Sequence, residues 1–243
     1  MLRTFKADLH IHTCLSPCAE VKMSPAGIID RAKAVDLDIL GICDHNSAEN
    51  TPAAMEAAQR HGLYVLPGME ITSMEEVHLL ALFDALEPVH VLQEIVYEHL
   101  PGKNDEKVFG MQVVAGADDE VLGFNQKLLI GATTLQLTEI VEAVHSLGGI
   151  AVAAHIDRQS FGIIGQLGFI PKGLALDALE ISARISKERA IDKYGSGLPY
   201  VQSSDAHRQE EIGRCHTMFS IGDVNIQEIQ KALKGIDGRR IMR

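Results

Sequence analysis

The amino-acid sequence predicts an α/β fold, a parallel barrel of alternating strands and helices that forms a single domain over residues 1–243. Short apolar runs alternate with helical patterns about seven times along the chain. The length of 243 residues is close to the ~250 residues that such barrels typically have. A doubly wound open sheet is the alternative. No Gly-x-Gly-x-x-Gly follows an expected strand, so the sequence does not support a dinucleotide site.

The first half of the chain predicts four strands and three helices. Residues 38–43 form a continuous apolar run, which is typical of a strand buried on both faces. Ser24 is a suitable N-cap and Pro25 suits the first helical position, so a helix is expected to begin there. Gly62 is a suitable end for the next helix. The strands are expected at residues 5–12, 38–43, 63–66 and 77–83, and the helices at 25–34, 51–61 and 89–99.

The second half resumes the alternation after one segment that is harder to interpret. Residues 101–133 are rich in glycine with scattered β-branched residues, and we interpret them as an insertion or an irregular segment. Gly148 and Gly149 are expected to end the helix that follows. Helices are expected at residues 138–147, 187–194 and 225–233, and strands at 150–154, 177–181, 200–203 and 218–221.

Composition limits the possible partners. The chain has 22 Lys and Arg against 33 Asp and Glu, a formal charge of −11, which argues against a broad basic surface for duplex nucleic acid. No apolar run reaches the ~18 residues of a membrane span, so no membrane partner is expected. Four cysteines form no disulfide framework, and the N-terminal residues contain no apolar signal region. The expected location is therefore the cytoplasm.

The first chemical motif is Asp8-Leu9-His10-Ile11-His12. Residues two apart on a strand share one face, so Asp8, His10 and His12 are expected to project together. Two imidazoles in that arrangement can reach one metal ion. A neighbouring carboxylate can hold an imidazole N–H and fix its tautomer. The alternative is a polar strand face in solvent.

Four more strand ends carry the same residue types. Taken singly, each has an ordinary explanation: Asp44-His45 is compatible with a helix-entry turn, and a lone His78 is more often structural. Together they would meet at one end of the barrel, where active sites of this architecture lie. Imidazole and carboxylate ligands without an essential thiolate suit Zn, Mn or Fe. These candidates are Asp44, His45, Glu70, His78, His155, Asp205 and His207.

Cysteine and arginine residues near these motifs add weaker candidates. Cys18 is close enough to the first motif to be a metal ligand. Arg158, Arg184 and Arg208 each follow a motif or a strand end, where a guanidinium can grip a phosphate with two hydrogen bonds. An ordinary surface charge pair is the competing interpretation for each arginine.

In order along the chain, from about residue 4 to residue 215, these motifs resemble those of the PHP (polymerase and histidinol phosphatase) family. The resemblance implies a distorted (β/α)7 TIM-like barrel and a metal-dependent phosphoesterase with two or three divalent ions. The implied ligands of a first ion are His10, His12, Glu70 and Asp205. A second ion would share Glu70 and add His78 and His155, and a third would take His45 and His207.

The family resemblance also identifies a difference. Six residues after His12, where other members place a histidine ligand, this chain has Cys18, so the third site is expected to take either Cys18 or Glu20. Asp8 and Asp44 resemble residues that support the ligands from behind.

The expected substrate is a small phosphomonoester, a nucleotide or a short single-stranded oligonucleotide, with no duplex partner. One alternative is a metal-dependent hydrolase of C–N bonds, because His-x-His also opens amidohydrolase barrels. Those usually bridge their metals with lysine, whereas Glu70 is available here. The other alternative is a non-catalytic, metal-binding regulatory module. A turnover assay with a phosphoester and added Mn or Zn separates these hypotheses, while the sequence leaves the oligomeric state open.

Overall fold

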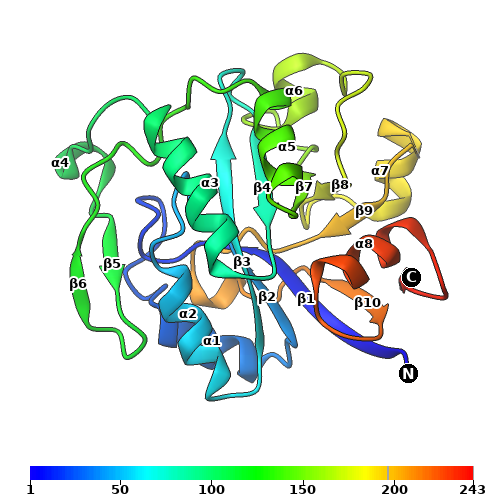
Figure 1. The fold of residues 1–243 in the computed structure, drawn as a ribbon, viewed down its shortest axis with the longest axis horizontal. Coiled ribbons are helices and arrows are strands. Elements are labelled where there is room, and N and C mark those ends of the chain that lie inside the picture. The colour runs from blue at the N-terminus through cyan, green and yellow to red at the C-terminus, as the bar shows by residue number, and fades with distance from the viewer. Residues whose placement is uncertain (196, 243) are drawn as a thin grey trace.

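A computed structural model describes residues 1–195 and 197–242. Seven strands form a barrel-like sheet, and consecutive strands of this series are neighbours (Figure 1). They are β1 (Arg3–Ile11), β2 (Ile39–Ile42), β3 (Tyr64–Thr72), β4 (His78–Leu82), β7 (Ile150–Ala153), β8 (Ala178–Ile181) and β9 (Tyr200–Gln202). A bridge between Ile11 and Ala206 joins the chain after β9 back to β1, so the sheet nearly closes. The predicted α/β barrel is therefore confirmed.

One strand departs from the expected parallel arrangement. β4 runs antiparallel to both of its neighbours, β3 and β7. The reason is the short connection of residues 73–77 after β3, which is too short for the helical crossover that a parallel neighbour needs. As a result, His78 begins β4 at the same edge where β3 ends, and it pairs with Thr72.

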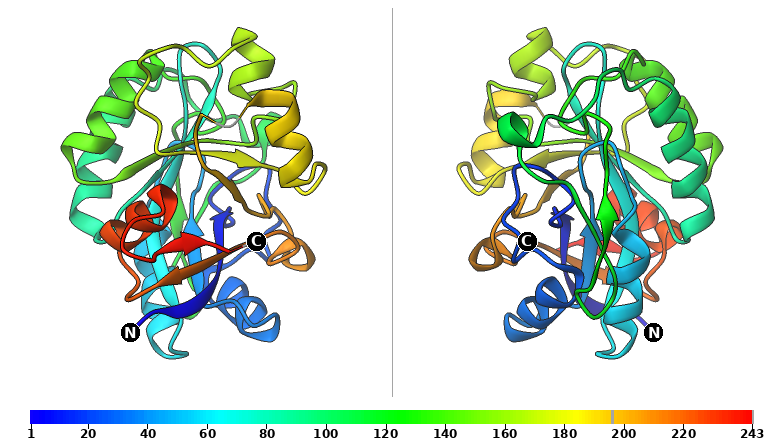
Figure 2. Two further views of the ribbon diagram at one scale, coloured as in Figure 1. Left: turned by 90° about the vertical axis from the view of Figure 1, so that its right-hand side faces the viewer. Right: turned by 90° about the vertical axis from the view of Figure 1, so that its left-hand side faces the viewer.

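Helices cover the outside of this sheet (Figure 2). The predicted cap at Ser24 is present, because its side chain accepts a hydrogen bond from the Gly27 amide. The longer helices are α1 (Pro25–Ala34), α2 (Thr51–Gln59), α3 (Leu86–Glu98), α5 (Leu137–Ser146), α7 (Lys187–Tyr194) and α8 (Ile226–Lys234). Short helical turns are α4 (Glu106–Phe109), α6 (Ile163–Leu167) and a 3₁₀ turn at Gln209–Glu211.

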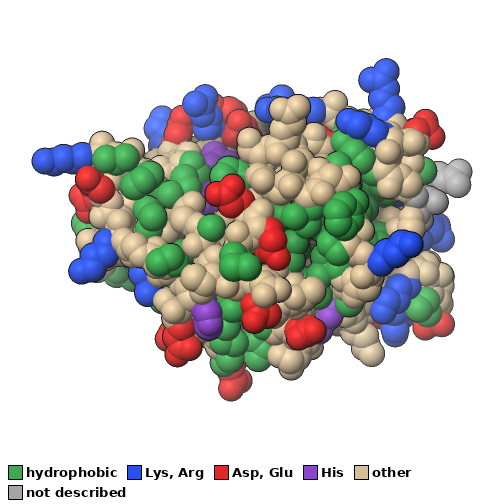
Figure 3. Space-filling model, turned by 90° about the horizontal axis from the view of Figure 1, so that it is seen from above, with side chains coloured by type: hydrophobic (Ala, Val, Ile, Leu, Met, Phe, Trp, Pro, Cys, Tyr) green, Lys and Arg blue, Asp and Glu red, His purple; other side chains and the backbone are tan. Residues whose placement is uncertain are grey.

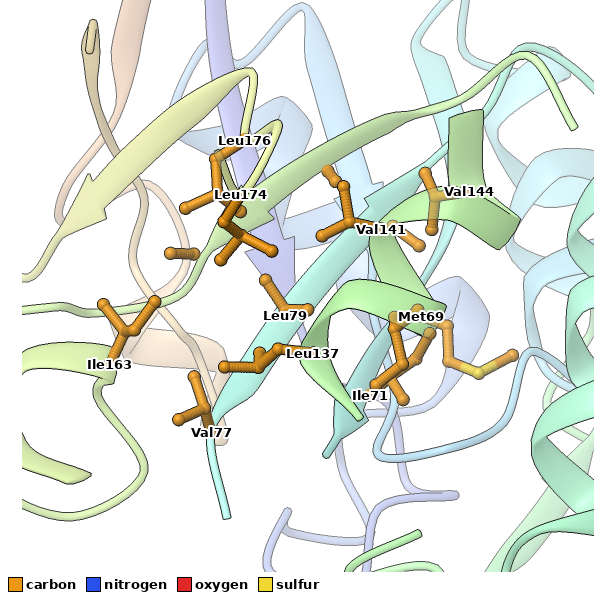
Figure 4. Close-up of a cluster of buried hydrophobic side chains, with 14 of the residues drawn as sticks. Met69, Ile71, Val77, Leu79, Leu137, Val141, Val144, Ile163, Leu174 and Leu176 are labelled. Carbon is orange, nitrogen blue, oxygen red and sulfur yellow. The ribbon is translucent and has the colours of Figure 1, made fainter. Parts of the chain in front are cut away.

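Alternate residues of the strands pack on opposite faces of the sheet. Leu79 of β4 belongs to the cluster that α5 covers, together with Val141 of that helix (Figure 4). Its neighbour Leu80 belongs to a second buried cluster with Val152 of β7. Both faces are therefore apolar, as predicted for strands of a covered barrel. This packing holds the strand ends that carry the polar motifs in fixed positions.

β3 is longer than predicted. Residues 64–67 pair in parallel with β2, and residues 68–72 pair antiparallel with β4. Pro67, which lacks an N–H donor, lies where the partner changes, and its carbonyl accepts a bond from the Phe83 amide. The proline therefore does not end the strand, and Glu70 lies within β3 instead of beyond it.

Two regions add structure outside the barrel. The segment interpreted as irregular contains α4 and a hairpin of β5 (Val113–Ala115) and β6 (Val121–Phe124). The Val113 amide donates to the Cys14 carbonyl, which fixes this hairpin to the loop after β1. β10 (Thr217–Ile221) and β11 (Arg240–Ile241) extend the sheet antiparallel beyond β1.

Charge is mixed on the face seen in Figure 3. Lys and Arg side chains lie mainly at its periphery, whereas acidic side chains also lie over its middle. This face therefore offers no broad basic surface. Among the described residues, no helix combines the length and apolar character that crossing a bilayer requires.

Candidate metal centre

The structure brings six histidines and two carboxylates together at the strand ends. They come from five separate stretches of sequence, as the strand-end pattern predicted. All are buried except His207, which is partly exposed. The residues are His10, His12, His45, Glu70, His78, His155, Asp205 and His207.

Glu70 is the centre of this cluster. Its Oε1 lies 2.8 Å from His78 Nδ1, 3.1 Å from His155 Nε2 and 3.4 Å from His10 Nε2. Its Oε2 lies 3.0 Å from His45 Nδ1 and 3.4 Å from His12 Nε2. One carboxylate thus faces five imidazoles: Oε1 faces three of them and Oε2 faces the other two. That is the position required of a group that bridges two ions.

Two buried hydrogen-bond chains fix the tautomers of the first motif. Glu180 Oε2 lies 3.0 Å from His10 Nδ1, so that nitrogen carries the proton and Nε2 is left with its lone pair. Ser16 Oγ lies 3.0 Å from His12 Nδ1 and donates to Asp44 Oδ1 over 2.6 Å. His12 is therefore oriented in the same way, with Nε2 available as a ligand.

The donor atoms fit divalent metal ions. His10 Nε2 and His12 Nε2 lie 3.1 Å apart, and with both protons on Nδ1 two lone pairs would face each other. A shared cation removes that repulsion, and Asp205 Oδ1 lies 3.1 Å from His12 Nε2 as a further ligand. Among the described residues, three sets have ligand atoms close enough to hold an ion: His10, His12 and Asp205; His45, Glu70 and His78; and His12, His45 and His207.

Electrostatics at the cluster also favour bound positive charge. Burial alone raises the pKa of Glu70, but the imidazoles of His78, His10 and His45 outweigh it and hold that pKa well below its usual range. Burial lowers the pKa of His10, but Glu180, Asp205 and Glu70 together raise it well above normal. The carboxylates therefore stay ionised and attract a proton, which a metal ion would replace.

Two ligand candidates lie on strained backbone. His155 has φ +27° and Asp205 has φ +51°, in the left-handed region that non-glycine residues seldom adopt. Such strain persists where surrounding contacts over-determine the conformation, and it is frequent at functional sites. Here the His155 amide donates to Glu180 Oε2 over 3.0 Å, and the carbonyl of Asp205 lies 2.9 Å from His207 Nδ1. Both turns direct side chains into the cluster.

Cys18 and Glu20 take different positions. Cys18 is exposed overall, and His207 and His45 are the imidazoles that influence its thiol, although Cys18 belongs to none of the three ligand sets. Desolvation of the sulfur raises the pKa of Cys18, but those two imidazoles outweigh it and lower the pKa to about 6. Glu20 instead pairs with Arg208 at the surface, 3.2 Å apart. Of the two candidates, only Cys18 lies beside the histidines.

We call His10, His12, Glu70, His78, His155 and Asp205 the inner cluster. His45, His207 and Cys18 form the outer cluster. The side chain of His207 is 26% exposed, whereas those of His10 and His12 are fully buried. The outer cluster thus lies at the solvent side of the site.

The three arginines differ in their distance from the centre. Arg158 forms an ion pair with Asp205, 2.5 Å between Nη1 and Oδ2, so it reaches the cluster. Arg208 is exposed and paired with Glu20, and Arg184 is exposed. The prediction that an arginine grips substrate is therefore best supported for Arg158. The structure gives Arg208 the surface charge pair that was its competing interpretation.

Asp8 and Asp44 lie behind the candidate ligands and make hydrogen bonds there. Asp8 was expected to hold an imidazole, but its oxygens accept from the amides of Ser204 and Gly213, each over 2.9 Å. Glu180, which lies in none of the predicted motifs, is the carboxylate that bonds His10. Its signal was present, because Glu180 interrupts the apolar run of β8 and a carboxylate buried in a strand needs a partner. Desolvation raises the pKa of Asp8 to about 6.

A barrel with a buried cluster of imidazoles and carboxylates at its strand ends defines a metal-dependent hydrolase. The family model for the PHP domain matches residues 8–170, and that for the PHP-associated region matches residues 188–235. The first match covers well over half of the chain, so the chain belongs to the PHP family and is a metal-dependent phosphoesterase. One continuous sheet runs through both matched regions.

Comparison with individual proteins gives more distant similarities. A 5'-3' exoribonuclease of Haemophilus influenzae is 25% identical over 63% of this chain and 69% of that protein. The Bacillus subtilis protein YqxK is 25% identical over 99% of this chain and 65% of its own length. The crystal structure of the lesion-specific endonuclease Q from Pyrococcus furiosus superposes with a TM-score of 0.73 at 22% identity. That alignment covers 99% of this chain but 58% of the endonuclease, and this likeness shows the fold alone.

Proposed function

We propose that the chain hydrolyses the phosphoester bond of a nucleotide or a short single-stranded oligonucleotide, with two or three divalent ions held by the inner and outer clusters. The observation that carries this proposal is the position of Glu70 between five imidazoles. Zn, Mn and Fe all suit this set of nitrogen and carboxylate ligands.

The proposed ligand sets are those that the family resemblance implies, and the contacts of Glu70 with His78 and His155 support them. His10, His12, Asp205 and Glu70 would hold one ion, and Glu70 would share a second with His78 and His155. The third ion would lie at the outer cluster, where His45 and His207 belong to one ligand set with His12 and the neighbouring Cys18 would supply a thiolate in place of an imidazole. When bound, such ions supply a water that ionises near neutral pH and neutralise charge on phosphoryl oxygens.

The protein's own residues would orient the metal ligands and bind the phosphate of the substrate. The Glu180–His10 and Asp44–Ser16–His12 chains keep both imidazoles in the ligand tautomer. Arg158, held against Asp205, presents a guanidinium to phosphate oxygens beside the ligands. The buried surroundings keep bulk water from competing with these contacts.

The substrate class is supported by two findings. The matched proteins include enzymes named as exoribonucleases, from Haemophilus influenzae and Salmonella typhimurium. The net charge of −11 disfavours a long duplex footprint. Endonuclease Q is known in complex with a 27-mer duplex that carries an abasic lesion, but this chain spans 59% of that protein. Duplex DNA therefore belongs in the substrate panel as the competing outcome.

The test begins with metal analysis of the purified protein, followed by phosphomonoesters, nucleotides, short oligonucleotides and duplex DNA with the measured metal. His10→Ala and Asp205→Ala should each abolish turnover while the chain stays folded. His61→Ala, which changes an exposed histidine on the surface, is the matched control. Full activity in either cluster variant would sink the assignment. Turnover of an amide substrate instead of phosphoesters would favour the C–N hydrolase.

A further inference from the structure

The loop between β7 and α6 is held in one conformation beside the metal centre. It begins at His155 and ends at Phe161-Gly162. The Asp157 carboxylate accepts from the amide and hydroxyl of Ser182, over 2.8 and 2.6 Å. A Cβ at position 162 would approach the Arg158 carbonyl to 2.6 Å, so the loop closes tightly there and only glycine fits. Side chains on this loop are therefore presented at fixed positions.

Phe161 is the unusual residue of the loop. Its φ is +60°, which is a rare conformation for a bulky side chain, and 37% of it is exposed. Its carbonyl accepts from the His78 amide over 2.9 Å, which holds the strained turn in place. Both the strain and the exposed ring oppose folding, and backbone strain of this kind clusters at ligand sites.

The ring of Phe161 lies flat on a metal-ligand candidate. Its centroid is 4.5 Å from that of His78, with 15° between the planes. His78 in turn contacts Glu70 at 2.8 Å, so one imidazole separates the ring from the centre. An exposed aromatic ring at this distance can stack on the base of a nucleotide whose phosphate lies at the centre.

We propose that Phe161 is the stacking platform for that base and makes the site select nucleotides over phosphoesters without a base. This inference rests on the proposed function for the location of the phosphate. Phe161 would contact the base and determine specificity, while the metal centre would act on the phosphorus. The competing role is packing alone, in which the ring only supports His78.

The two roles differ in how they respond to the base. We would measure binding of AMP and of ribose 5-phosphate, which lacks the base, by calorimetry in the presence of Mn²⁺. Phe161→Leu should lower the affinity for AMP by about 10- to 100-fold more than the affinity for ribose 5-phosphate, because base stacking on an aromatic ring is lost. Phe161→Tyr should bind AMP as the wild type does. Phe169→Leu, which changes another exposed phenylalanine, is the control.

A measurement on the wild-type protein with the diamagnetic ion Zn²⁺, recorded before AMP is consumed, keeps the test independent of variant folding. Adenine proton signals of AMP should shift upfield on binding, because of the ring current of Phe161. Equal affinity of the wild type for both ligands, or equal weakening of both in Phe161→Leu, would overturn the proposal. Absence of phosphoester turnover with preferential AMP binding would instead overturn the proposed function and leave Phe161 as a base-binding residue.

Discussion

The inner and outer clusters use similar residue types in different surroundings. The inner imidazoles of His10 and His12 are fully buried, and a second hydrogen bond fixes each ring. In the outer cluster, His207 is partly exposed and Cys18 lies at the surface. Buried charged groups are tolerated only when paired, so the inner cluster depends on its partners. The outer cluster has the access that substrate and solvent require.

The largest effect is expected from breaking the inner cluster at its shared ligand. Glu70→Gln keeps the shape but removes the charge that five imidazoles face. We expect turnover to fall by at least about a thousandfold, which corresponds to ~4 kcal/mol of transition-state stabilisation, because both ions that activate water and neutralise phosphoryl charge would lose their shared ligand. Metal content, measured by mass spectrometry of the dialysed protein, should fall with it. A variant that retains its full metal content would contradict the bridging role.

A smaller effect is expected when only the support of an inner ligand changes. Glu180→Gln leaves every candidate ligand in place but removes the negative charge from the side chain whose Oε2 lies 3.0 Å from both His10 Nδ1 and the His155 amide. Partners behind metal ligands typically contribute about 10- to 100-fold to metal affinity, and we expect a loss in that range. Competition with a chelator measures it. Glu142→Gln on the exposed surface of α5 is the control and should bind metal normally.

The outer cluster should respond more mildly. Cys18→Ser replaces the thiolate with a poor ligand, so the affinity of the outer cluster for metal should fall while the inner ions stay bound. We expect roughly a tenfold fall in turnover, by analogy with other single supporting contacts. In the Co²⁺-loaded protein the sulfur-to-metal absorption band should disappear. Cys215→Ser, which alters a buried cysteine away from the cluster, should keep that band. Persistence of the band in Cys18→Ser would remove this residue from the ligand set.

The smallest effect on the site is expected from a carboxylate outside both clusters. Arg239 and the Gly222 amide lower the pKa of Glu228 to about 2, from a normal value near 4.5. A lowered folded-state pKa stabilises the fold above pH ~4.5, and that stabilisation is lost as the pH falls towards 2. Glu228→Gln should therefore cost about 1 kcal/mol of unfolding free energy at pH 7. Urea unfolding should show the cost vanishing near pH 2, with metal content unchanged at pH 7. A loss of metal at pH 7 would mean that the scaffold and the site are coupled.

Much of the site could be predicted because its candidate ligands lie on strands or within a few residues of a strand end. The period of two in Asp8-Leu9-His10-Ile11-His12 places alternate residues on one face whatever the rest of the chain does. The apolar runs then place the other motifs at neighbouring strand ends. Glu180 was missed because its partner is 170 residues away, and only the pairing of β8 within the barrel brings the two together. The same applies to Ser16, whose role depends on Asp44, two residues after the end of β2.

By itself, the sequence determined the α/β barrel, the family and the residue types at the centre, since these follow from local periodicity and from short motifs. Tertiary structure alone decided the antiparallel direction of β4, the tautomers of His10 and His12, and the strained turn that exposes Phe161. It also separated Cys18, beside two imidazoles, from Glu20, paired with Arg208. The physical reason is that hydrogen-bond partners and exposure are properties of elements distant in the chain, which become defined only when the barrel closes.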